Sequence, residues 1–282
     1  MLERGAIRSI MQGAPARIAL RWGGGAVLLV AVGFLGHRLI GLGAGELLSK
    51  ASWPLVAAMS AATLLFAASD ALLARAWAIL ADPAGSIPTR RALGIYGSGV
   101  LTKYLPGSVF QYVSRQVGGS RAGIAHTRLA QASVDEIVIH LAASLTVAAL
   151  LLLAWANPVL ASAGSAGLIM ALLWAPRAPF RALALQVLAF GGFGAAAAMT
   201  GMALFPEGSA FASFAGLFLL AWLAGFLVPI APGGLGVREA TLIVLAASVA
   251  GPAEVTVAVL ALRISSILGD LVFGLTALAR SR

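Results

Sequence analysis

Long apolar runs separated by short polar segments dominate the chain. Six of these runs have about the length that a helix needs to cross a bilayer, and they lie near residues 22–42, 54–80, 129–155, 159–175, 182–203 and 254–279. They are rich in Leu and Ala, and apolar and polar residues do not alternate within them, which argues against transmembrane β-strands. The pattern therefore predicts an all-α, polytopic integral membrane helical bundle with about six full spans.

Two further apolar segments are interrupted by proline and glycine. The first segment covers 92–118 and breaks at Pro106 and Gly107. Its first arm, residues 92–104, would rise only about 20 Å as a helix. That rise is less than the hydrocarbon thickness, so we expect this hairpin to enter and leave the membrane on the same face.

The second interrupted segment covers 211–250. Its break lies within 229–236 and contains Pro232, Gly233, Gly234 and Gly236. This hairpin either re-enters like the first or forms two complete spans, and both of its ends return to the same face in either case. In transporters, a pair of Pro/Gly-interrupted segments in the two halves of the chain marks a site near the bilayer midplane.

The charged residues between the spans divide by sign. With the N-terminus inside, the inner loops hold Arg90, Arg91, Arg115, Arg121, Arg128, Arg177, Arg181, Arg280 and Arg282. The outer loops hold Glu46, Lys50, Glu207 and Glu254. The positive-inside rule then predicts cytoplasmic N- and C-termini, a basic cytoplasmic segment over 1–21, and hairpins that enter from opposite faces.

Composition agrees with a membrane protein. Hydrophobic residues make up 60% of the 282 residues and charged residues only 10%, and the mean hydropathy is +0.97. We therefore expect residues 1–282 to form a single transmembrane domain. The formal charge of +9 resides mostly in short loops that face lipid head groups, and basic residues do not interleave with aromatic residues, so no nucleic-acid partner is expected.

Few residues have the chemistry of a catalytic centre. The chain has no Cys, and His37, His126 and His140 are scattered without ligand spacing. Asp135 and Glu136 are paired in sequence, but neighbours on a helix point about 100° apart and would not flank one bond easily. We therefore expect no catalytic residues, no metal and no cofactor, and a protein that is not an enzyme.

Charged and polar residues cluster at the first break. Lys103 and Tyr104 precede it, and Gln111 and Arg115 follow it on one helical face. Together with helix N-terminal amides after the break, these residues predict a basic, hydrogen-bonding pocket for a lipid phosphate. The alternative is an interfacial turn whose Lys and Arg extend to the head groups.

The second break is followed directly by Arg238 and Glu239, and Arg263 lies about midway along the last span. An arginine at that depth needs a partner or a wet cavity. Glu136 near the inner end of its span needs a cation in turn, and the candidates are Arg115, Arg238 and Arg263. These residues predict either a head-group site or a purely structural ion pair such as Glu136 with Arg263.

Three pieces of the chain resemble the membrane domain of the lysylphosphatidylglycerol synthase/flippase family. They are Lys103-Tyr-Leu-Pro-Gly107 with the Glu136 region, Pro232-Gly-Gly-Leu-Gly-Val-Arg238-Glu239, and the final helix with Arg263. The resemblance runs from about 53 to 279 and implies re-entrant helices and a role in moving or handling lipids. The soluble domain that transfers the aminoacyl group in two-domain members has no counterpart in these residues.

We therefore expect a lipid flippase or lipid-handling transporter of the bacterial inner membrane that binds an anionic phosphate head group. Its substrate-binding residues would be Lys103, Tyr104, Gln111, Arg115, Glu136, Arg238, Glu239 and Arg263. The alternatives are translocation of a polyprenyl-phosphate-linked sugar and a non-catalytic membrane subunit that partners a lipid- or glycan-modifying enzyme.

Overall fold

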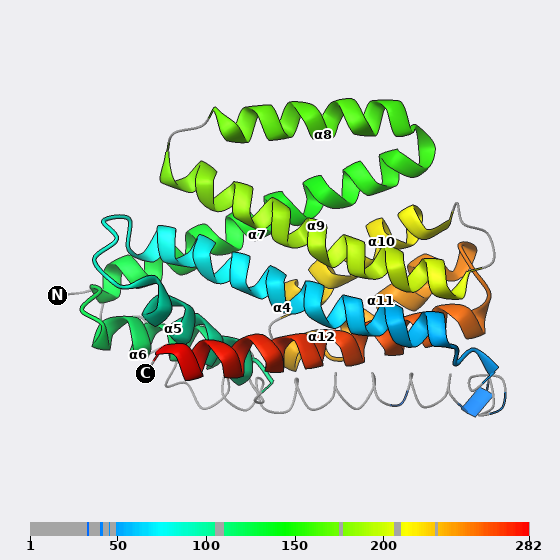
Figure 1. The fold of residues 1–282 in the computed structure, drawn as a ribbon, viewed down its shortest axis with the longest axis horizontal. Helices are drawn as coiled ribbons and strands as arrows, with labels where there is room; N and C mark the ends of the chain where they lie inside the picture. The colour runs from blue at the N-terminus through cyan, green and yellow to red at the C-terminus, as the bar shows by residue number, and fades with distance from the viewer. Residues whose placement is uncertain are drawn as a thin grey trace, which may run out of the picture.

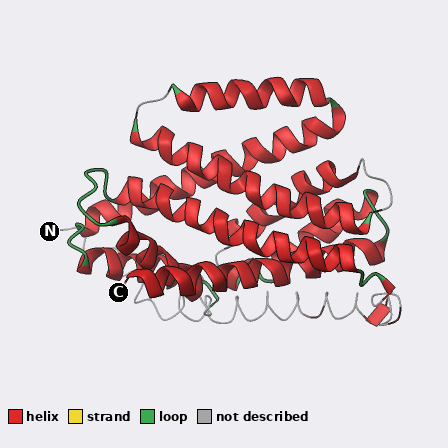
Figure 2. Cartoon of the chain, viewed as in Figure 1, coloured by secondary structure: helices red, strands yellow, loops and turns green. Residues whose placement is uncertain are grey.

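The computed structural model describes residues 49–104, 110–174, 177–205, 210–228 and 231–281, with the single positions 33, 40, 41 and 45. Within these residues all regular structure is helical, in agreement with the all-α prediction (Figure 2). The helices are α4 (Trp53–Ala81), α5 (Thr89–Thr102), α6 (Phe110–Arg121), α7 (His126–Ala156), α8 (Pro158–Leu173), α9 (Ala178–Leu204), α10 (Ala210–Leu227), η1 (Pro232–Gly234), α11 (Val237–Leu245), η2 (Ala246–Ser248) and α12 (Pro252–Ser281).

Four of these helices, α4, α7, α9 and α12, are long and apolar enough to cross a membrane. They coincide with four of the six predicted spans. The fifth, α8, has 16 residues and is shorter than a typical span. The predicted first span at 22–42 falls outside the described residues apart from positions 33, 40 and 41, as do Pro106 and Gly107.

The helices at the two interruptions are short. α5 has 14 residues and α6 has 12, which correspond to about 21 and 18 Å of rise. They pack on each other, and the Ser98 and Ser114 hydroxyls lie 2.8 Å apart. α11 has only nine residues, or about 14 Å, so it is too short to cross hydrocarbon.

Local sequence explains where the helices begin. The Ser52 hydroxyl accepts from the Leu55 N–H at 3.4 Å ahead of α4, and the Asn157 side chain accepts from the Leu160 N–H at 3.1 Å ahead of α8. Proline occupies the first turn in both helices, where its missing N–H costs nothing. These caps fix the first residues of α4 and α8, and Asn157 also marks the end of α7.

The interruptions lie at different ends of the bundle. Figure 1 shows α5 and α6 at the end that holds the C-terminus, and α10 and α11 in the opposite half. Arg91 donates to the Arg121 carbonyl at 3.2 Å, and Arg128 donates to the Leu80 carbonyl, so the arginine-rich loops meet at the C-terminal end of α4. The Lys50–Glu254 ion pair, at 2.6 Å, lies at the other end of α4.

Close helix packing depends on glycine where α12 crosses α4. A Cβ atom on Gly269 would lie 2.6 Å from the Phe66 Cβ and 2.9 Å from the Thr63 carbonyl oxygen. Both neighbours belong to or adjoin the backbone, so neither can rotate away. α4 also packs along α9, and Phe66 contacts Phe193 with ring centroids 5.1 Å apart. The α4–α9–α12 group thus forms the tightly packed centre of the bundle.

Gly269→Ala is expected to destabilise the protein by about 1–3 kcal/mol, because the added methyl group must push α12 away from α4. Gly191→Ala in α9 is the matched control, since a Cβ there meets nothing within 4 Å. Thermal unfolding of both variants in detergent micelles measures the difference. Equal melting temperatures for the two variants would contradict this packing.

Candidate functional site

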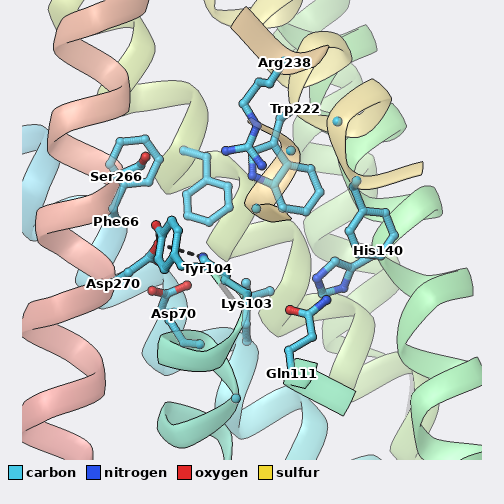
Figure 3. A pocket seen from close by; sticks show the side chains of 18 of the residues that line it. Phe66, Asp70, Lys103, Tyr104, Gln111, His140, Trp222, Arg238, Ser266 and Asp270 are labelled. Carbon is cyan, nitrogen blue, oxygen red and sulfur yellow. Dashed lines mark hydrogen bonds and ion pairs between the residues drawn. The ribbon is translucent and has the colours of Figure 1, made fainter. Parts of the chain in front are cut away.

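A cavity of about 110 Å³ lies in the centre of the bundle, between the two interrupted segments. It has room for on the order of ten waters. Seven of the eight residues predicted to bind substrate line it: Lys103, Tyr104, Gln111, Arg115, Glu136, Arg238 and Arg263. The eighth, Glu239, lines a smaller pocket that shares Arg238 and Arg263 with the first. Residues separated by 160 positions in sequence thus meet at one site (Figure 3).

The second break contains three glycines with positive φ, and two of them, Gly233 and Gly234, line the cavity. Gly233, Gly234 and Gly236 have φ values of 58°, 70° and 82°, which side chains with a Cβ rarely adopt. Gly234 also lies against α10, since a Cβ there would be 3.3 Å from the Gly225 backbone. The Glu239 side chain accepts from the Gly236 N–H and caps α11. The turn places Arg238 in the first turn of α11.

Arg263 of α12 anchors this turn. Its Nη1 donates to the Gly233 carbonyl at 3.1 Å and lies 3.4 Å from Glu239 Oε1. The Arg263 Nε and Nη2 atoms are buried and have no hydrogen-bond partner among the described residues. One edge of the guanidinium is therefore engaged by protein and the other is left free.

Glu136 pairs with Arg115 instead of Arg263, so the structural pair suggested above is wrong. Arg115 Nη1 lies 2.8 and 2.7 Å from the two Glu136 oxygens, and the Tyr96 hydroxyl donates to Oε1 at 3.1 Å. The guanidinium is also sandwiched between the rings of Tyr96 and Tyr112, at 4.7 and 4.9 Å. Arg115 comes from the shorter first hairpin, which the sequence pattern left at uncertain depth, and the structure buries it at 5% exposure.

Lys103 pairs with Asp270, which lies about two helical turns beyond Arg263 on α12. Lys103 Nζ lies 2.7 Å from Asp270 Oδ2, and the Tyr104 hydroxyl donates to the same oxygen. Asp70 of α4 lies beside this group, as Figure 3 shows. Neither Asp70 nor Asp270 was among the predicted site residues. Their signal in the sequence was the position of each carboxylate within an apolar span, where an ionisable residue is a functional candidate by default.

Arg238 contacts an aromatic ring and forms no ion pair with a described carboxylate. Its guanidinium carbon lies 5.3 Å from the Trp222 ring centroid. Its Nε is buried without a hydrogen-bond partner among the described residues, and no ion pair joins it to a described carboxylate. Figure 3 shows Arg238 and Trp222 together at one side of the cavity.

The site holds equal numbers of cationic and carboxylate side chains, but not all of them form ion pairs. The cations are Lys103, Arg115, Arg238 and Arg263, and the carboxylates are Asp70, Glu136, Glu239 and Asp270. Three ion pairs use three of each. Arg238 and Asp70 are left over, and each has a buried side-chain atom without a hydrogen-bond partner in the described part of the chain.

An aromatic wall formed by Trp222, Phe226 and His140 lines part of the cavity. Trp222 and Phe226 stack with centroids 5.4 Å apart, and both contact the His140 ring. His140 Nδ1 lies 2.6 Å from Gln186 Oε1 in a fully buried contact. Asp135 faces away from the cavity and accepts from Gln131 at 2.7 Å. The wall supplies apolar surface beside the arginines.

Within the described residues, no group of three or more His, Asp or Glu side chains has metal-binding geometry. The residues that line the cavity offer electrostatic and hydrogen-bonding contacts: arginine nitrogens without a partner among the described residues, three tyrosines and the aromatic wall. Comparison with protein-family models, curated proteins and solved structures found no match to this chain.

Proposed function

We propose that this protein is a lipid flippase or lipid-handling transporter that binds an anionic phosphate head group in the central cavity. The observation that carries the proposal is that two arginines lining one cavity have buried side-chain nitrogens without a hydrogen-bond partner among the described residues. Arg238 Nε, Arg263 Nε and Arg263 Nη2 have no partner among the described residues. Buried donors of this kind are rare and are stabilised by an acceptor with two or more oxygens, such as phosphate.

The interrupted helices support a transport role. On this proposal α5–α6 and α10–α11 are re-entrant hairpins that enter from opposite faces, with the arginine-rich loops on the cytoplasmic side of a bacterial inner membrane. Non-helical backbone at membrane depth is tolerated where it lines a cavity, as Gly233 and Gly234 do. The head group would cross through the cavity while the acyl chains stay in lipid.

The test is translocation by the purified protein in liposomes. Fluorescent phosphatidylglycerol is placed in both leaflets, and a quencher added outside measures the fraction that becomes accessible. We expect faster exchange than in protein-free liposomes and no effect on diacylglycerol, which has no phosphate.

A parallel assay with a polyprenyl-phosphate-linked sugar separates the two cargo classes, since both offer a phosphate. Movement of only the polyprenyl lipid would assign the cargo to that class. Movement of neither, with a folded and monodisperse protein, would reject transport by the chain alone and favour a partner subunit of a lipid- or glycan-modifying enzyme.

A further inference from the structure

The Asp70 carboxyl group is buried without a donor for one of its oxygens. Asp70 is 4% exposed, and its Oδ2 has no hydrogen-bond partner among the described residues. A carboxylate oxygen in that position loses its hydration without compensation. The cation that would neutralise it, Lys103, is already paired with Asp270 at 2.7 Å. Asp70 therefore needs either a ligand or a proton.

The surroundings of Asp70 favour a bound proton over an anionic carboxylate. Asp270 of α12 lies next to Asp70 in the cavity, as Figure 3 shows, and is itself 4% exposed. Two carboxylates side by side cannot both stay ionised in a low-dielectric site when a single ammonium group serves them, and a shared proton resolves the repulsion. That proton would also supply the donor that Asp70 Oδ2 lacks.

The other titratable groups around the pair do not remove this need. From the α5 end, Lys103 and Tyr104 both bind Asp270, and the Tyr96 hydroxyl donates to Glu136. From α12, Arg263 is directed to Gly233 and Glu239. The cavity-lining residues of α9 and α10 are Phe193, Trp222, Gly225 and Phe226, none of which titrates.

We propose that Asp70 and Asp270 form a proton-binding site that holds one exchangeable proton between them at neutral pH. The site lines the same cavity as Arg238 and Arg263. If the proposed lipid transport holds, the bound proton is the coupling ion. The site would take up a proton at one face of the membrane and release it at the other as the head group crosses. Asp70 is then a proton carrier and makes no contact with the phosphate.

Asp70→Asn tests the site, because the amide replaces the protonated acid with almost no change in shape and can donate to Asp270. The Lys103–Asp270 ion pair is untouched, so the variant should fold. Asp135→Asn is the matched control, since that carboxylate faces away from the cavity on α7. Size-exclusion profiles and melting temperatures of both variants should match those of the wild type.

Infrared difference spectra of the purified protein detect the proton directly. We expect a carboxylic-acid C=O band at neutral pH that shifts in D₂O, is lost in Asp70→Asn and is retained in Asp135→Asn. Absence of the band from the wild type, or its full retention in Asp70→Asn, would overturn the site. This readout needs no lipid, so it stands even where the transport assay fails.

Transport with a pH difference across the liposome tests the coupling. One proton per lipid would give up to about tenfold lipid asymmetry per pH unit in the wild type. Asp70→Asn should equilibrate lipid between leaflets without accumulating it. Lipid movement by the wild type that ignores the pH difference would overturn the coupling, and no lipid movement at all would count against the proposed function itself.

Discussion

Arg115→Met should destabilise the folded protein by about 3–5 kcal/mol, the cost of leaving a buried partner charge uncompensated. Glu136 is 3% exposed and receives Arg115 through both carboxylate oxygens. Methionine keeps an unbranched stem but removes the charge, both hydrogen bonds to Glu136 and the cation–π contacts with the two tyrosine rings. Equilibrium unfolding in mixed micelles, followed by tryptophan fluorescence, measures the loss.

Two companion variants show whether the buried charge is the cause. The double variant Arg115→Met/Glu136→Gln removes both charges and should recover a large part of the lost stability. Lys50→Met breaks the Lys50–Glu254 pair, whose side chains are 33% and 18% exposed, and should cost at most about 1 kcal/mol. A double variant as unstable as Arg115→Met would mean that packing, and not the unpaired carboxylate, dominates.

Arg238→Gln should weaken head-group binding by roughly 10- to 150-fold, because a hydrogen bond to a charged group contributes about 1.5–3 kcal/mol. Arg238 forms no ion pair with a described carboxylate, so its loss leaves no buried carboxylate without its partner. Stability should therefore change little while lipid binding and translocation fall. Titration of nanodisc-embedded protein with the lipid identified in the transport assay measures the affinity.

Arg280→Gln is the matched control, because Arg280 is an exposed arginine at the end of α12. It should bind and translocate lipid like the wild type. Arg263→Gln should lose both binding and some stability, since Arg263 also holds the Gly233 carbonyl. Unchanged binding in Arg238→Gln would remove this residue from the site.

The helical class and four of the spans follow from apolar length alone, which is why α4, α7, α9 and α12 match their predicted ranges closely. The break within 229–236 was also predictable, because a cluster of glycines interrupts a helix. The structure uses three of these glycines at positive φ, a conformation that favours glycine. Helix lengths near the breaks were less predictable. α11 ends at Leu245 although the apolar run continues to 250, because a 3₁₀ turn at 246–248 ends it.

The sequence indicated which charged residues lie at the site, but not which cation pairs with which carboxylate. Charged residues in apolar segments must avoid lipid, so Arg115, Glu136 and Arg263 were expected to meet inside the bundle. Which cation serves which carboxylate depends on the rotation and depth of separate helices, and residue spacing within one helix carries no such information. Asp70 was assigned no role from the sequence for this reason: only its position beside Asp270 of α12 distinguishes it from an isolated carboxylate.

If an anion binds in the cavity as proposed, the contacts of Arg263 would link its binding to the position of the turn ahead of α11. Nη1 of the Arg263 guanidinium contacts both the Gly233 carbonyl and Glu239, while Nε and Nη2 are buried without a hydrogen-bond partner among the described residues. An anion on the free edge would compete for the same positive charge and loosen the turn ahead of α11. Conversely, a shift of α11 would change how strongly the guanidinium attracts an anion. Cargo release and hairpin movement would therefore share one side chain as their energetic link.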